Sequence, residues 1–564
     1  MCRLTAAALL LALLVGCGGG GGGGGGGDNA ATPEAPGALN DPSAYSSRPE
    51  ASLPGAVEAA AVTQHRLVLD GREIAYTATA GHLIAREPLA GAAQASIFHV
   101  AYTADGADPA TRPVTFFYNG GPGSASVWLH LGSFGPKRLA TGVPATTAPR
   151  PFPLVDNADS LLDSTDMVFV DAVGSGRSQA IAPYRNRDFW SVAADAALFR
   201  DAIRRWLQIH GRQASPFFLY GESYGGPRTA VLARRLQEAG AWPAGLVLQS
   251  PALDYNSNCG VSEANDIPCT GYLPSYAATA AWHGLSSPAP AELEGWLAAA
   301  RDFATSRYAP ALQAWLAAAT PAPELWPPLA ALTGLPAANW QQDFNLGPTR
   351  YRERLIAGRL IGRYDARMTA PVGSPLAADG DPSSTWIASS FAGAIDAYLR
   401  DTLRYRNTST YVLSSSAIEH WDFSHAGRSM PDTVPDLAAA LAADPALRVL
   451  VINGVYDLAT PFHVTESDLS RIGSERVGVR NHPGGHMSFL DDAVRPQQKA
   501  DLAAFLAEAT AGRPARRAPL AAIPRPPPDR AGAPAMAVAP PLPEPALQAP
   551  LRDPWVPARR EPER

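Results

Sequence analysis

The sequence predicts an α/β protein built on a doubly wound, mostly parallel sheet. Short runs of β-branched and aromatic residues, each followed by turn residues, are typical of strands buried on both faces of such a sheet. Segments with helical spacing of apolar residues lie between these runs. From residue 255 to about residue 398 the strand pattern gives way to Ala-, Leu- and Trp-rich segments, which predict a largely helical cap insertion.

Five strands and two helices follow from these patterns. The strands are expected at Val114–Tyr118, Asp166–Asp171, Phe217–Tyr220, Gly245–Gln249 and Leu447–Ile452, with a sixth candidate at Glu475–Arg480. The helices are expected at Trp190–His210, which Gly211 ends, and at Pro227–Glu238.

The first 17 residues are expected to be a lipoprotein signal sequence. Arg3 supplies the positive start, and the apolar run Leu9–Val15 is far shorter than the ~20 residues that a spanning helix needs. Leu14-Val15-Gly16-Cys17 resembles the bacterial lipobox, which is cut before a lipidated cysteine. We therefore expect an exported protein, periplasmic or at the cell surface, that is bound to the membrane only through a lipid on Cys17. An ordinary signal peptide with an accidental cysteine is the alternative.

The remaining chain divides into a tether, a folded domain and a tail. The glycine tract at 18–27 opens an expected flexible tether at 18–60, and the folded domain is expected at 61–510. Residues 511–564 are rich in Pro and predict a disordered tail, either inert or a Pro-rich ligand for a partner. The net charge of −6, without a Lys/Arg block, gives nucleic-acid binding no support. The oligomeric state does not follow from the sequence.

The four cysteines give no metal pattern. CxxC pairs are absent, and no histidine stands near Cys259 or Cys269 at ligand spacing, so neither a metal nor an organic cofactor is implied. In an exported protein, Cys259 and Cys269 are expected to form a disulfide that closes a small loop at the start of the cap.

A candidate nucleophile stands between a predicted strand and a predicted helix. Gly221-Glu222-Ser223-Tyr224-Gly225 fits G-x-S-x-G, the sharp turn that exposes a serine in the α/β-hydrolase fold. Without that context the motif would be an ordinary Gly/Ser turn. We therefore predict that Ser223 is a nucleophile.

A serine nucleophile needs a base and an acid that orients it. In this fold the chain order is Ser, then Asp or Glu, then His. Asp457 follows the predicted strand Leu447–Ile452, and His486 lies in the turn-rich segment Pro483-Gly484-Gly485-His486-Met487. Either residue alone carries little information, since the chain has 11 histidines. Together with Ser223, they predict a catalytic triad.

Acyl transfer also needs backbone N–H donors for the oxyanion. Tyr224, directly after the nucleophile, supplies one, and a Gly-rich loop after an early strand should supply the second. Asn119-Gly120-Gly121-Pro122-Gly123 is such a loop. A phosphate loop is excluded because no Lys-Ser/Thr follows it.

These motifs, in this order, resemble the serine carboxypeptidase family. The resemblance rests on Asn119-Gly120-Gly121-Pro122-Gly123, on Glu222-Ser223-Tyr224, on Asp457 and on His486-Met487, and it spans about Ala61 to Glu508. Phe189-Trp190 and the Gly/Ser loop at 171–178 are also similar to the family. The chain looks most like a bacterial branch.

The resemblance implies hydrolysis of peptides with a free C-terminus. Ser223 would attack, His486 would act as base and then acid, and Asp457 would orient it. Gly121 and Tyr224 would donate the oxyanion N–H groups. Asn119, Gly120 and Glu222 would bind the C-terminal carboxylate of the substrate.

The sequence departs from the family at three places. Ser124 stands where the family often has a disulfide cysteine, Phe117 where it often has Trp, and no further glutamate is evident in residues 129–136. An esterase or acyltransferase on the same triad is the alternative activity, and a catalytically inactive surface or adhesion protein is the alternative class.

Overall fold

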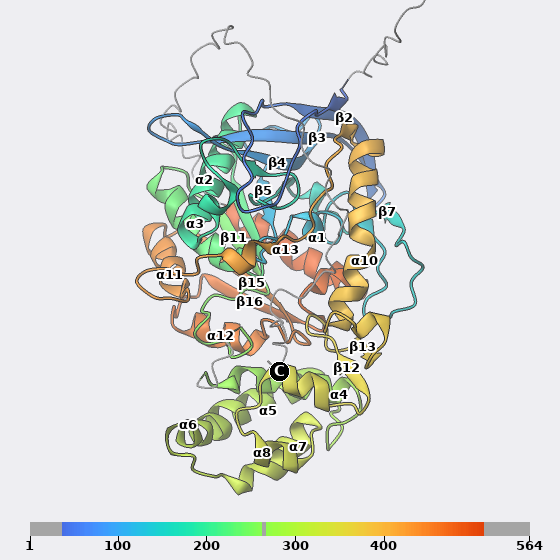
Figure 1. Ribbon diagram of the computed structural model, residues 1–564, viewed down its shortest axis with the longest axis vertical. Coiled ribbons are helices and arrows are strands. Elements are labelled where there is room, and N and C mark those ends of the chain that lie inside the picture. The colour runs from blue at the N-terminus through green and yellow to red at the C-terminus, as the bar shows by residue number, and fades with distance from the viewer. Residues whose placement is uncertain (1–36, 262–266, 512–564) are drawn as a thin grey trace, which may run out of the picture. The chain divides into compact units, whose positions relative to one another are not determined.

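The computed structural model describes residues 37–261 and 267–511 (Figure 1). The predicted signal sequence, the lipidation site Cys17, the glycine tract and the Pro-rich tail beyond residue 511 lie outside the described residues. Within the described ranges, none of the helices combines the length and the apolar character that crossing a membrane requires.

A ten-stranded sheet forms the core, in the order β16-β15-β11-β10-β5-β8-β4-β3-β2, with β9 paired to β4. All strand pairs from β16 to β8 are parallel, and the pairs that involve β4, β3 and β2 are antiparallel. The strands are β2 (Ala60–Leu69), β3 (Arg72–Arg86), β4 (Ala93–Ala104), β5 (Val114–Tyr118), β8 (Asp166–Val170), β9 (Gln179–Ala180), β10 (Phe217–Glu222), β11 (Gly245–Gln249), β15 (Arg448–Gly454) and β16 (Val477–His482). The predicted mostly parallel α/β sheet is thus confirmed.

Helices cover both faces of this sheet, as a doubly wound fold requires. Neighbouring residues of a strand point to opposite faces, so Phe116 and Phe117 of β5 enter two different apolar clusters. One face carries α2 (Val192–Ile209), α3 (Gly225–Glu238) and α11 (Val434–Ala443); the other carries α1 (Val127–His130), α10 (Pro382–Ala397) and α13 (Arg495–Thr510).

The segment after β11 is largely helical and has its own apolar core, which also includes Tyr456 and Phe462 from the region after β15. Figure 1 shows α4 to α8 gathered together next to α12 (Phe462–Ser470). Cys259 and Cys269 are joined by a disulfide where this segment begins. Its elements are α4 (Leu273–Trp282), α5 (Leu293–Phe303), α6 (Ala309–Ala318), α7 (Trp326–Thr333), α8 (Ala337–Gln342), α9 (Pro348–Arg354), β12 (Arg359–Ile361) and β13 (Thr369–Pro371).

The last helix of the predicted insertion differs from the others. Trp386, Ile387 and Phe391 of α10 are buried in the main core and not in the core of α4 to α9. The cap that residues 255–398 were expected to form is therefore built from α4 to α9, and α10 is part of the main body.

Residues 37–60, which we assigned to the tether, lie against the main body. β1 (Leu39–Asn40) pairs with β14 (Tyr405–Arg406), and Leu53 is buried against Ile84 and Ile181. These contacts satisfy backbone groups and bury apolar side chains, which a composition-based prediction does not detect. The small hairpin of β6 (Lys137–Leu139) and β7 (Leu154–Asp156) completes the strands.

Candidate active site

Ser223 lies in the turn between β10 and α3, at the carboxyl edge of the parallel strands. Its φ is +61°, a left-handed conformation that is uncommon for a residue with a side chain. The turn is closed by hydrogen bonds from the Ser223 N–H to the Gln249 carbonyl, 2.9 Å, and from the Gly226 N–H to the Ser223 carbonyl, 2.8 Å. This is the geometry that exposes a serine hydroxyl at the end of a strand.

The strand and the helix approach each other so closely that the residue before Glu222 must be glycine. A Cβ at Gly221 would overlap the carbonyl group of Gly225 in the first turn of α3. The small residues of the motif thus allow the sharp turn, as the sequence pattern indicated.

Asp457 and His486 meet behind this turn, although they come from different loops. Asp457 follows β15 and His486 follows β16, and the two strands are parallel neighbours. The Asp457 Oδ2 atom lies 2.7 Å from His486 Nδ1. Both side chains are buried, Asp457 completely.

Both residues are fixed by further hydrogen bonds. Asp457 Oδ1 accepts from the N–H groups of Ala459 (2.7 Å) and Thr460 (3.1 Å), and its Oδ2 accepts from the Thr460 hydroxyl at 2.8 Å. The backbone N–H of His486 donates to the Tyr364 carbonyl at 2.6 Å, and the backbone carbonyl of His486 accepts from the Ser250 hydroxyl at 2.8 Å. The imidazole orientation is therefore set by several groups, as a general base requires.

The second ring nitrogen of His486 faces Glu222. Its Nε2 atom lies 3.0 Å from Glu222 Oε1, while Glu222 Oε2 accepts a short hydrogen bond from the Asn119 side-chain amide. In the part of the chain that the structure describes, no hydrogen bond joins the Ser223 hydroxyl to His486. Glu222 thus contacts Nε2, the ring nitrogen to which a nucleophilic serine would donate its hydrogen bond.

The two carboxylates change the proton affinity of the imidazole. Burial disfavours the charged ring, but the nearby charges of Asp457 and Glu222 outweigh burial and raise the pKa of His486 to about 10. This arrangement therefore favours the protonated ring, which must lose its Nε2 proton before it can act as a base.

Two backbone N–H groups beside Ser223 are free to bind an oxyanion. Among the described residues, neither the Gly121 N–H nor the Tyr224 N–H donates to a protein group. A Cβ at Gly120 would overlap the Tyr224 backbone nitrogen, which shows how closely the glycine loop and the nucleophile turn approach. Unpaired donors at such a place are the basic element of an oxyanion hole.

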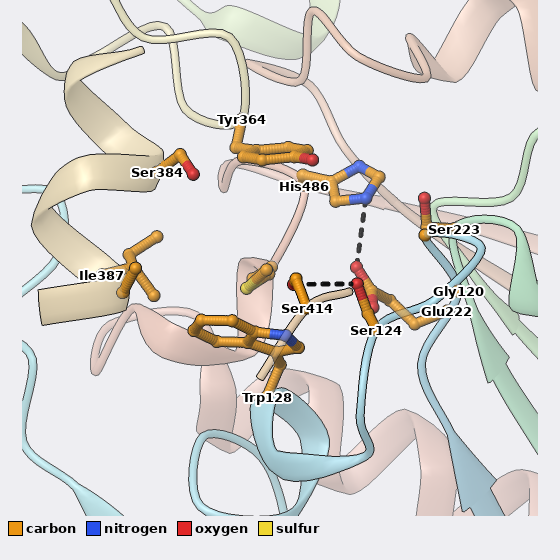
Figure 2. A pocket seen from close by; sticks show the side chains of 13 residues that line it. Gly120, Ser124, Trp128, Glu222, Ser223, Tyr364, Ser384, Ile387, Ser414 and His486 are labelled. Carbon is orange, nitrogen blue, oxygen red and sulfur yellow. Dashed lines mark hydrogen bonds and ion pairs between the residues drawn. The ribbon is translucent and has the colours of Figure 1, made fainter. Parts of the chain in front are cut away.

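Glu222, Ser223 and His486 line one pocket together with the glycine loop (Figure 2). Figure 2 shows Ser384 and Ile387 projecting from α10 across the pocket from Ser223, with Tyr364 beside His486 and Trp128 at another wall. The complete lining is Gly120, Gly121, Ser124, Trp128, Glu222, Ser223, Tyr364, Ser384, Ile387, Ala388, Ser414, His486 and Met487.

Most of the predicted site residues come together in this region: Ser223, Asp457, His486, Gly120, Gly121, Tyr224, Asn119 and Glu222. Cys259 and Cys269 lie at the start of the cap, and Cys17 lies outside the described residues. Ser124, which stands where the family often has a disulfide cysteine, faces Ser414, and the two hydroxyl oxygens lie 3.3 Å apart. Of the described residues, Glu222 is the one carboxylate in the lining, in line with the missing glutamate at 129–136.

Several residues of the site were not identified from the sequence. Thr460 is one of them, although it lies only three residues after Asp457. Met487 belongs to the His486-Met487 motif, but no role in the site was assigned to it. The wall residues Ile387 and Ala388 lie in an Ala- and Ser-rich helix that carries no motif. In the described ranges, no group of three or more His, Cys, Asp or Glu side chains is arranged to bind a metal ion.

Comparison with known proteins identifies a relationship over the first part of the body. The family model described as serine carboxypeptidase matches residues 73–242. Serine carboxypeptidase 1 of Hordeum vulgare is 28% identical over 133 residues, which are 23% of this chain and 25% of that protein. The matched region thus spans about a quarter of the barley relative. The resemblance predicted from the motifs is thus confirmed over residues 73–242.

The chain is also similar to solved structures. One is a prohormone-processing carboxypeptidase of Saccharomyces cerevisiae, with 14% identity and a TM-score of 0.47. The match covers 76% of this chain and 91% of that chain. A proline iminopeptidase of Mycobacterium smegmatis matches with 16% identity, a TM-score of 0.30 and coverage of 79% and 99%.

Proposed function

We propose, because residues 73–242 match the serine carboxypeptidase family model, that this chain hydrolyses the C-terminal peptide bond of peptides through an acyl-enzyme intermediate. The matched range contains Asn119, Gly121, Glu222 and Ser223. Asp457 and His486 lie beyond it, so their catalytic roles rest on their position in the site.

The observation that carries the proposal is the carboxylate of Glu222, which is hydrogen-bonded to Asn119 and lies beside the nucleophile. Glu222 is 3% exposed, it accepts a hydrogen bond from Asn119, and it lines the same pocket as Ser223. A substrate carboxylate could bind here only if it shares a proton with Glu222. A plain esterase binds no substrate carboxylate and therefore has no use for such a group.

The proposed reaction begins when the C-terminal carboxylate enters and shares a proton with Glu222. That proton comes from His486 Nε2, which is then neutral and can accept the Ser223 proton while Oγ attacks the carbonyl carbon. Asp457 orients the ring, and the N–H groups of Gly121 and Tyr224 stabilise the oxyanion.

The tetrahedral intermediate then collapses with proton transfer from His486 to the leaving amine, which releases the C-terminal amino acid. Water, deprotonated by His486, attacks the ester on Ser223 and restores the free serine. Asn119 and Gly120 would bind the carboxylate together with Glu222 in the first half of the reaction. All of these groups belong to the chain itself.

The test offers the purified enzyme N-blocked dipeptides with free and with amidated C-termini. We expect kcat/KM for the free acid to exceed that for the amide at mildly acidic pH. Equal rates, or hydrolysis of acyl esters without release of C-terminal residues, would instead support an esterase or acyltransferase.

We also propose that the protein is exported and attached to the membrane by a lipid on Cys17. The support is the lipobox-like Leu14-Val15-Gly16-Cys17 after a short apolar run, and the glycine tract that follows it. A disulfide between Cys259 and Cys269 agrees with an oxidising compartment. A tether at 18–36 would then keep the catalytic domain away from the membrane surface.

A further inference from the structure

We infer that the pocket beside Ser223 selects substrates whose C-terminal residue has an uncharged, apolar side chain, and that Ile387 and Ala388 of α10 determine this selection. The inference deepens the proposed function and rests on it. It concerns which amino acid is released, and the family relationship does not supply that answer.

The position of the carboxylate site decides which substrate residue enters the pocket. The carbonyl under attack lies at Ser223, and the free carboxylate lies at Glu222, directly beside it in the same pocket. In a peptide, these two groups belong to the last peptide bond and the last residue. The side chain between them is therefore that of the C-terminal residue, and it must project toward the remaining walls.

Those walls are largely apolar. Trp128, Ile387, Ala388 and Met487 line the pocket, and Figure 2 shows Ile387 across from Ser223. The other polar residues of the lining are serines and Tyr364. Among the described residues of the lining, Glu222 is the one acidic side chain and His486 the one basic side chain, and both are assigned to the chemistry.

A charged C-terminal side chain would lose its hydration against these walls without gaining a partner. Transfer of a charge to such surroundings is strongly unfavourable unless it is paired. An acidic side chain would also meet the Glu222 carboxylate, which would repel it. An apolar side chain gains from the same walls, because it removes apolar surface from water.

The wall on α10 is held rigidly in place. Trp128 of α1 packs on Phe391 of α10 with ring centroids 4.9 Å apart, and Trp386 donates from its indole N–H to the Thr141 carbonyl at 3.1 Å. At the start of α10, the Asp381 side chain accepts from the Ser383 N–H at 3.0 Å. A wall fixed by its neighbours can discriminate by size as well as by polarity.

The α10 wall and the loop that carries Ser223 come from different parts of the chain. Ser384, Ile387 and Ala388 lie outside residues 73–242, the range that matches the family. The catalytic loop is thus shared with relatives, while the opposite wall comes from a part of the chain with no such match.

The experiment measures kcat/KM for N-blocked dipeptides that differ only in their C-terminal residue: Leu, Phe, Ala, Lys and Glu. We expect Leu and Phe to exceed Lys and Glu by on the order of tenfold to a hundredfold, the discrimination that apolar pockets reach.

Two variants on α10 assign this preference to its wall. Ile387→Asp places a carboxylate in the wall and should raise the Lys/Leu ratio of kcat/KM by at least about tenfold. Ala388→Leu keeps the wall apolar and fills part of the space, so kcat/KM for the dipeptide ending in Phe should fall relative to that for the dipeptide ending in Ala. This variant remains informative if Ile387→Asp does not fold. Gly393→Asp is the control, because Gly393 lies in the same helix but is exposed and outside the pocket. It should leave both ratios unchanged.

The outcomes separate this inference from the proposed function. Release of all five residues at similar rates, or unchanged ratios in both α10 variants, would overturn the inference while the carboxypeptidase activity stands. If no C-terminal residue is released but acyl esters are hydrolysed, the proposed function fails and the inference fails with it.

Discussion

Ser223 combines an uncommon backbone conformation with a partly buried position at the end of a strand, where it lines the pocket. Ser223→Ala removes the nucleophile but keeps a small side chain at the same φ, so the fold should persist. Removal of the serine from such triads lowers kcat by on the order of 10⁶. Circular dichroism and a peptidase assay on the same preparation check this, and substantial remaining activity in a folded variant would contradict the role of Ser223.

Glu222 and Asp457 act together on the proton of His486. Because burial alone disfavours the charged ring, removal of one carboxylate charge should lower the pKa of His486 from about 10. Glu222→Gln should therefore give neutral His486 at a lower pH than in the wild type. NMR titration of the imidazole signals measures this shift. The signals of His82, which contacts Tyr405 and Ser96, serve as the control and should not move.

At this scale the sequence predicted which residues gather at the site better than it predicted their surroundings. Ser223, Asp457 and His486 have fixed chain order and turn-rich neighbours, which are visible in one dimension. The contact of Glu222 with His486 Nε2 is different, since it depends on how two loops after neighbouring strands face each other. The same is true of Thr460, whose hydroxyl lies 3.0 Å from His486 Nδ1.

At the scale of elements, hydrogen bonds that connect α2 and α3 to the end of β5 support the glycine loop. Arg228 of α3 is completely buried and donates to Asp195 of α2 at 2.6 Å and to the Asn119 carbonyl at 2.5 Å. Arg228 thereby connects both helices to the residue that binds Glu222. The guanidinium also lies over the Phe199 ring, 4.6 Å from its centroid.

Arg228→Met should lower the free energy of unfolding by about 3–5 kcal/mol, because Asp195 would remain buried without its partner. Adding Asp195→Asn removes that charge and should recover much of the loss. The Asn119 carbonyl stays unpaired in both variants, so the defect in kcat/KM for free-acid peptides should persist. Urea unfolding and kinetics on both variants check this; a double variant with full activity would show that Arg228 has no part in positioning the loop.

The strands near the active site were predicted closely, and those at the antiparallel edge were not identified. β5 and β11 have the predicted bounds, whereas β10 and β15 extend two residues further, to Glu222 and Gly454. The parallel strands are buried on both faces and appear as continuous apolar runs. β2 and the first half of β3 alternate between more and less buried residues, so a search for continuous apolar runs passes over them. The place of α10 in the main core depends on distant contacts that helical spacing alone does not indicate.

At the scale of the whole molecule, the proposed attachment to the membrane depends on one residue, Cys17. Cys17→Ser should move the protein from the membrane fraction to the soluble exported fraction, since we expect a lipid and not a spanning helix to anchor it. Cell fractionation measures the release, and mass spectrometry of the mature N-terminus should show a lipidated cysteine. An unmodified N-terminus downstream of Cys17 would contradict the anchor.

The central claim, that Glu222 recognises the C-terminal carboxylate of a peptide, is tested most directly by kcat/KM against pH for matched acid and amide substrates, in wild type and Glu222→Gln. A shared proton is lost as the pH rises, so wild-type hydrolysis of the acid should fall at a lower pH than that of the amide. The side-chain amide that Glu222→Gln introduces donates without titrating, so the variant should extend hydrolysis of the acid to higher pH. If both substrates show the same alkaline limb and the substitution leaves it unmoved, Glu222 does not bind the carboxylate and the account is contradicted.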